Sequence, residues 1–190
     1  MPDPCPEVME FLLSRRSRPA KTLGAGGPDR AGLERILTAA ARSPDHGKLE
    51  PWRFVIIEGA ARERAAVLAL GRARALELDE KTTVKAVAAF GQGDIIVAVI
   101  SSPKPSEKIP LWEQQLSAGA VCLALLNAAL ASGWGANWLT GPMAYDTAFC
   151  REILSCGEGE AVAGFIHMGT ETVAPPDRPR PNVGALTSWA

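Results

Sequence analysis

The chain has 190 residues, and 47% of them are hydrophobic, which is enough for one globular domain with its own core. Its 20 basic and 21 acidic residues nearly cancel, so no overall charge attracts nucleic acid or an anionic membrane. Any anion site must therefore be local, and we expect neither a nucleic-acid partner nor a membrane partner.

The first helix is predicted directly after the N-terminal prolines. Apolar side chains recur there at helical spacing, at Val8, Phe11 and Leu12. Arg15 is the next member of this stripe, so its guanidinium should point inward and needs a partner. The helix has to end before Pro19, because proline cannot continue it and restricts the residue before it.

The rest of the chain mixes predicted helices and strands. Asp29 is a candidate N-cap for a helix whose apolar stripe covers residues 33–41, and Asp146 is another for a short helix ending near residue 154. The other predicted elements are a strand at 52–58, one or two exposed helices at 60–90 broken near Gly71 or Asp79, a buried strand at 94–102, a long helix at 111–132, a strand at 133–139 and a strand at 160–170. This order indicates a two- or three-layer α+β fold.

The most apolar stretch is SAGAVCLALLNAALA at residues 117–131. A membrane-spanning helix needs roughly 20 apolar residues, so this stretch predicts a helix buried in protein on nearly every side. A small domain cannot easily surround such a helix, so we expect a second copy of the chain to cover part of it. The acidic, proline-rich N-terminus is unlike a secretory signal, and we expect a cytoplasmic protein with reduced cysteines.

Several kinds of chemistry lack their usual motifs. The chain has no G-x-G-x-x-G between a strand and a helix and no G-x-S-x-G. His46 and His167 are far apart and belong to no zinc-binding spacing, so we predict no metal site, and His167 is expected to pack in the core. We nominate no catalytic side chain; if the protein is an enzyme, a cofactor should carry the reaction.

The segment SRRSRPAK, residues 14–21, concentrates positive charge in an otherwise balanced chain. It could be a solvated helix end, a nucleic-acid-binding arm, or a cradle in which arginine side chains and a serine hydroxyl bind one phosphate. No aromatic residue is interleaved with the basic ones, which disfavours the arm. The inward register of Arg15 favours the cradle.

Four segments together resemble the FMN-dependent nitroreductase family. They are RRSRPAK after the first helix, LERILTAAARSPDHGKLEPWRFVII, the long helix that begins WEQQLSAGA, and GWGANWLTG after it. The resemblance is to the small bacterial members and spans about residues 8–170. It implies a single FMN-binding domain over residues 1–190, with a core at about 8–170 and an extended C-terminal tail at 171–190 that reaches the partner subunit.

The resemblance also implies a fold and an activity. The fold would be a central, mostly antiparallel (mixed) sheet of four to five strands flanked by helices, in a homodimer with FMN at the interface. The activity would be electron transfer from NADH or NADPH, through FMN, to a nitroaromatic, a quinone or a similar acceptor. Two alternatives stay open: another flavin-dependent redox reaction on the same fold, or a flavin-binding protein without enzymatic activity.

Residue by residue, the resemblance implies cofactor contacts from eight positions. These are Arg15, Arg16, Ser17, Arg42, His46, Leu139, Thr140 and Gly141. His46 would reach the site across the dimer interface. Related small members have Arg-Ser-Gly where this chain has Leu139-Thr140-Gly141, so one cationic contact is missing. Arg178 or Arg180 could supply a basic contact from the tail, whereas Arg18 and Lys21 are left without a role and are expected to be solvent-exposed.

Overall fold

Five strands form one open sheet in the order β1-β5-β3-β2, with β4 also paired to β5. The computed structural model describes residues 3–190. β5 is the longest strand; it pairs with β3 along one edge and with β4 and then β1 along the other. All of these pairings, and that of β2 with β3, are antiparallel. Within residues 3–190 the sheet therefore has no parallel pair and is not mixed. The strands are β1 (Leu23–Gly24), β2 (Trp52–Ile57), β3 (Ile95–Ser101), β4 (Gly135–Leu139) and β5 (Ala161–Glu171).

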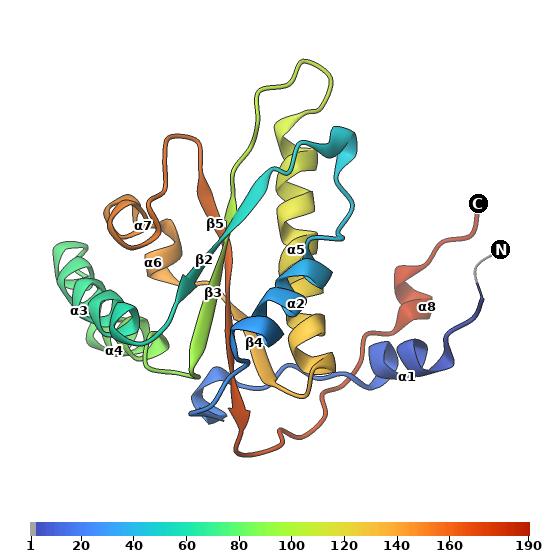
Figure 1. Cartoon of the computed structure of the whole chain (residues 1–190), viewed down its shortest axis with the longest axis horizontal. Coiled ribbons are helices and arrows are strands. Elements are labelled where there is room, and N and C mark those ends of the chain that lie inside the picture. Colours follow the sequence, from blue (N-terminus) through green and yellow to red (C-terminus); the bar gives the residue numbers. More distant parts are fainter. Residues whose placement is uncertain (1–2) are drawn as a thin grey trace.

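Helices cover both faces of the sheet, which confirms the α+β fold in three layers (Figure 1). One face packs against α3 (Ala60–Ala75), α4 (Glu80–Ala89), α6 (Pro142–Tyr145) and α7 (Thr147–Leu154). The other face packs against α2 (Arg30–Ala40) and α5 (Leu111–Ala131). α1 (Pro6–Ser14) and α8 (Val183–Leu186) lie beyond α5, on the side of the molecule where both chain ends lie.

The central strand β3 explains why two cores form. All seven of its residues are buried, as its continuous apolar sequence predicts. Because side chains alternate along a strand, Ile96, Ala98 and Ile100 face the α3–α4 side, and Val97 and Val99 face α5. The cysteines are free thiols, as predicted, and burial raises the pKa of Cys122 to about 12.

The predicted helix starts are confirmed by capping hydrogen bonds. The carboxylate of Asp29 accepts from the N–H of Gly32 at 2.8 Å, and that of Asp146 accepts from the N–H of Phe149 at 2.8 Å. In the segment 60–90 the break falls at Asp79, which caps α4, whereas α3 runs through Gly71. The start of α4 is therefore set by a local sequence signal, whereas the start of α3 at Gly59 has no side-chain cap.

The N-terminal helix differs from its prediction. It ends at Ser14, so Arg15 lies just beyond the helix and not within its apolar stripe. None of its residues is buried, and Val8 and Leu12 are 51% and 48% exposed. The tail was expected to be extended throughout, but it forms α8 near its end, capped by the side chain of Asn182. Two chain ends with exposed apolar side chains therefore lie on one side of the molecule.

α5 is the central helix of the α2 side. It is long and apolar enough to cross a membrane by composition alone. One face, from Gln114 to Ala129, is buried against α2 and the sheet. The opposite face leaves Trp112, Leu116 and Leu123 exposed at 60%, 62% and 46%. A single chain thus covers α5 on only part of its circumference.

Candidate functional site

The basic segment runs from the end of α1 to the free edge of β4. The main-chain N–H of Arg18 donates to the carbonyl oxygen of Ala136 at 2.8 Å. The side-chain amide of Asn137 donates to the carbonyl oxygen of Arg18, also at 2.8 Å. These two bonds fix Arg15, Arg16 and Ser17 beside the strand that leads to Leu139.

Arg15 and Arg16 form a cationic pair organised around Ser17. Nη2 of Arg15 donates to Oγ of Ser17 at 2.9 Å, and Nη1 of Arg16 donates to the carbonyl oxygen of Ser17 at 3.1 Å. The Nε atom of each arginine is buried without a hydrogen-bond partner, and neither forms an ion pair with a carboxylate within residues 3–190. Buried donors without acceptors are costly, so the pair suits an anionic ligand with several oxygens.

The tail adds a further guanidinium to this cluster. Burial, and then the charges of Arg180, Arg16 and Arg18, lower the pKa of Arg15. Arginine nevertheless stays protonated, so the site holds several positive charges close together. Arg180 donates to Asp177 at 2.7 Å, while the charge of Arg178 makes no ion pair in the part of the chain described. Of the two tail residues considered, Arg180 is therefore the one within electrostatic reach of Arg15.

The two basic residues expected to be exposed behave differently. Lys21 is exposed, as predicted. The prediction for Arg18 is wrong, because Nε of Arg18 lies 3.0 Å from Oε2 of Glu171 and both side chains are about one-quarter exposed, at 27% and 29%. Arg18 neutralises a carboxylate at the end of β5, and its charge is not free for a ligand.

Leu139, Thr140 and Gly141 lie at the other end of β4. A strand rises about 3.3 Å per residue, so the loop begins roughly 10 Å from Ala136, where Arg18 is attached. The loop leaves β4 through Gly141, whose φ of 144° favours glycine. A ligand with an anionic tail at the arginines and a ring at this loop would follow the strand. Six of the eight predicted residues thus lie along β4: Arg15 to Ser17 near its start and Leu139 to Gly141 at its end.

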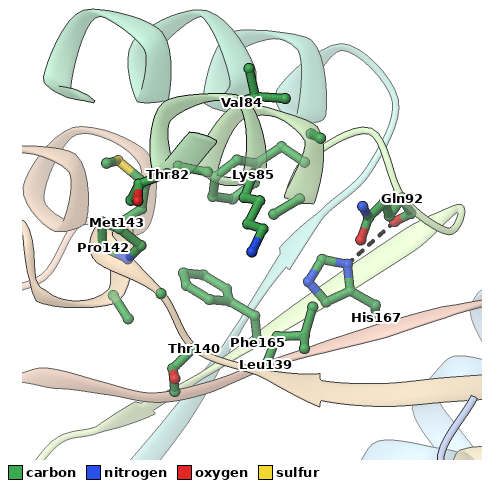
Figure 2. A pocket seen from close by; sticks show the side chains of 16 residues that line it. Thr82, Val84, Lys85, Gln92, Leu139, Thr140, Pro142, Met143, Phe165 and His167 are labelled. Atoms are coloured by element: carbon green, nitrogen blue, oxygen red, sulfur yellow. Dashed lines mark hydrogen bonds between the residues drawn. The ribbon is translucent and has the colours of Figure 1, made fainter. Parts of the chain in front are cut away.

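The loop also lines a cavity of about 420 Å³ on the α4 side of the sheet. The walls are mostly apolar and come from α4, residues 139–144, Phe165 and His167 (Figure 2). Lys85 extends from α4 into this space. Lys85 belongs to no sequence motif, so sequence reasoning missed it.

His167 is buried in this wall, as its apolar surroundings predict. Its Nδ1 lies 3.3 Å from the carbonyl oxygen of Gln92, and since a carbonyl only accepts, Nδ1 carries the proton. Burial lowers the pKa of His167 to about 4, and the charge of Arg62 adds to this effect. The ring is therefore neutral near pH 7, and its other nitrogen is a hydrogen-bond acceptor.

Arg42 and His46 lie far from the arginine pair within one chain. His46 contacts Glu113 in the first turn of α5, with Nδ1 2.7 Å from Oε2. α1, which leads into Arg15, borders a groove at the other end of α5, near Asn127. Fourteen helical residues separate these points, or about 21 Å. Arg42 is exposed just after α2, at the end of α5 where His46 lies, so one chain does not assemble all eight residues.

Comparisons with known proteins identify the family to which the chain is similar. The model of the nitroreductase family matches residues 12–170. The Escherichia coli K12 protein named "Putative NAD(P)H nitroreductase YdjA" is 38% identical over 165 residues, which are 86% of this chain and 88% of the relative. A Haemophilus influenzae protein named "Putative NAD(P)H nitroreductase" is 33% identical over the same shares of the two chains.

Solved structures show the same fold. A nitroreductase-like family protein from Bacillus cereus superposes with a TM-score of 0.80 at 20% identity, covering 96% of this chain and 95% of the other. Iodotyrosine deiodinase, solved with FMN and 3-iodo-L-tyrosine, superposes with a TM-score of 0.69 at 17% identity, covering 92% and 95%. At these identities the structures establish the architecture alone.

Proposed function

The chain belongs to the nitroreductase family, and from this premise we propose that it is an FMN-dependent oxidoreductase that passes electrons from NADH or NADPH to a nitroaromatic, quinone or similar acceptor. The observation that carries the proposal is the pair Arg15 and Arg16 at the edge of β4, whose buried Nε donors find no hydrogen-bond partner among residues 3–190. The names of the relatives supply the electron donor, and the FMN bound to iodotyrosine deiodinase indicates a flavin for this fold.

Each group of residues has a distinct part in this proposal. Arg15 and Arg16 neutralise the phosphate of FMN, and the hydroxyl of Ser17 adds a contact to the phosphate or the ribityl chain. Arg180 lies near enough in the tail to affect Arg15, but its own charge is paired with that of Asp177. The backbone of Leu139, Thr140 and Gly141 borders the ring.

Bound FMN would supply the electron-transfer chemistry, for which the side chains of this protein have no substitute. The chain's own residues bind the cofactor, orient it along β4 and leave one side open to exchanging substrates. No side chain is assigned as a general acid or base. Leu139 stands where related small members have arginine, so the protein relies on the arginines at the other end of the strand for charge.

We propose a homodimer, because Arg42 and His46 can join Arg15 only from another chain. The exposed face of α5, with Trp112, Leu116 and Leu123, is the natural surface for that contact. In a two-fold dimer, the start of one α5 can approach the end of the other. His46 of the partner would then lie beside the basic segment.

The test is spectroscopic and anaerobic. Protein reconstituted with FMN should be yellow, lose its flavin absorbance when NADH or NADPH is added, and regain it with a nitroaromatic or a quinone. A protein whose flavin is bleached by neither NADH nor NADPH would be a flavin carrier, and this result would refute the enzymatic proposal. A protein that takes up no FMN would refute both.

A further inference from the structure

The cavity between α4 and the cofactor loop is the strongest unassigned feature of the molecule. Its volume of about 420 Å³ lies within the roughly 300–1,000 Å³ typical of small-molecule sites. Phe90, Phe165 and Met143 give it apolar walls, and all three are at least 96% buried. Such walls favour a flat aromatic ring.

One positive charge, that of the exposed residue Lys85, borders this apolar space. Lys85 lies on the face of α4 that also carries Thr82, Ala86 and Ala89, the helical spacing that lines the cavity. Figure 2 shows its ammonium group directed toward the space between Phe165 and His167. Lys85 forms no ion pair with any carboxylate of residues 3–190.

The other groups around the cavity leave its field positive. None of the lining residues is acidic. His167 is neutral near pH 7, and Arg62 lies close enough behind it to lower its pKa. An ammonium beside apolar walls, paired with no carboxylate of residues 3–190, interacts most favourably with an anionic group on the ligand.

We propose that this cavity is the acceptor pocket and that it selects aromatic compounds carrying a negative charge, with Lys85 as the ionic partner of that charge. The inference rests on the proposed function, because Leu139, Thr140 and Gly141 border both the cavity and the cofactor. An aromatic anion bound here therefore lies next to FMN. Lys85 determines specificity and takes no part in holding the cofactor.

The test compares two ligands of similar shape, 4-nitrobenzoate and the neutral 4-nitrotoluene. Binding to the oxidised FMN-loaded protein is measured by calorimetry without nicotinamide, so no turnover occurs. We expect wild-type protein to bind 4-nitrobenzoate about 2- to 5-fold more tightly, a typical effect for a partly exposed ion pair. Lys85→Gln should abolish this preference, Lys85→Glu should reverse it, and Lys85→Arg should keep it.

Lys81 provides a matched control. It is an exposed lysine on α4 that does not line the cavity, so Lys81→Gln should keep the wild-type preference. Equal affinity of wild-type protein for both ligands, or a preference that survives in Lys85→Gln, would overturn the proposal. Loss of FMN from Lys85→Gln would also overturn it, because the cavity would then belong to the cofactor.

Failure of this inference can be told apart from failure of the proposed function. A protein that is reduced by NADH or NADPH but shows no ligand preference keeps its function and loses the assigned specificity. A protein that takes up no FMN loses the proposed function, whatever it binds in the cavity. In that case 4-nitrobenzoate binding to the flavin-free protein still reports on Lys85 itself.

Discussion

The main-chain N–H of Arg18 donates a 2.8 Å hydrogen bond to the carbonyl oxygen of Ala136, and this bond joins the basic segment to β4. Asn137 adds a second bond, from its side-chain amide to the carbonyl oxygen of Arg18. The arginines that precede Arg18 are therefore held in register with the loop that follows β4. A cofactor with an anionic tail and a ring could therefore extend along β4, from the arginines to this loop.

Removing either cradle arginine should weaken FMN binding. Arg15→Gln and Arg16→Gln each delete a charged donor, and hydrogen bonds to charged groups contribute about 1.5–3 kcal/mol, so we expect at least a tenfold increase in Kd. The Kd is measured from the quenching of FMN fluorescence as protein is added. Lys21→Gln, an exposed change in the same segment, is the control and should bind like wild type. Equal affinities for all of these proteins would rule out the cradle.

The bond from Asn137 should matter for positioning. Asn137→Ala removes the half-buried amide that donates to the carbonyl oxygen of Arg18. Losing this hydrogen bond should lower the free energy of unfolding by about 1 kcal/mol. FMN affinity should fall by about 2- to 5-fold, since the arginines lose their register but not their charge. Urea denaturation and flavin titration together check this. A stability loss with unchanged flavin affinity would restrict Asn137 to a structural role.

Sites shared between subunits predict complementation in mixed dimers. Arg15→Glu and His46→Glu homodimers should each bind FMN weakly. If Arg15 and His46 come from different chains, a mixed dimer contains one intact and one doubly altered site. Random mixing should then restore wild-type affinity to about a quarter of the chains, since half the dimers are mixed. No restoration in mixtures that contain mixed dimers would show that the two residues do not share a site across the interface.

His167 should stay neutral through most of the physiological range. Its pKa is lowered to about 4 in the folded protein, against about 6.5 unfolded. The unfolded chain therefore binds a proton first, and stability is full above pH 6.5 and declines as the pH falls toward 4. NMR of the ring protons measures the pKa directly. A midpoint near 6.5 in the folded protein would contradict the burial of the ring.

Local signals account for the parts of the fold that the sequence predicted. Asp29 and Asp146 cap helices through bonds to residues three positions ahead, and β3 is recognisable because it is apolar throughout. β1 was not predicted, because its two residues pair with the distant end of β5. Local signals did not reveal that α1 ends at Ser14. Arg15, which was expected to belong to the apolar stripe of this helix, therefore lies just outside it.

Some features of the candidate site are visible in the sequence, and others depend on the fold. The concentration of Arg15, Arg16 and Ser17 is visible in the sequence, whereas the pairing of Arg18 with Glu171 depends on how β5 and β4 meet. Lys85 lies in an exposed helix without any motif, and only the fold brings it over Phe165. The distance between His46 and the arginines follows from the path of α5, which no local pattern encodes.

The central claim is that this chain holds FMN and accepts electrons from a nicotinamide. The most direct measurement is the visible absorbance of FMN-reconstituted, desalted protein before and after anaerobic addition of NADH or NADPH. The account predicts a retained flavin spectrum, with one FMN per chain, that is bleached by at least one of the two nicotinamides. A protein that emerges colourless from desalting, or whose flavin neither nicotinamide reduces, would contradict it.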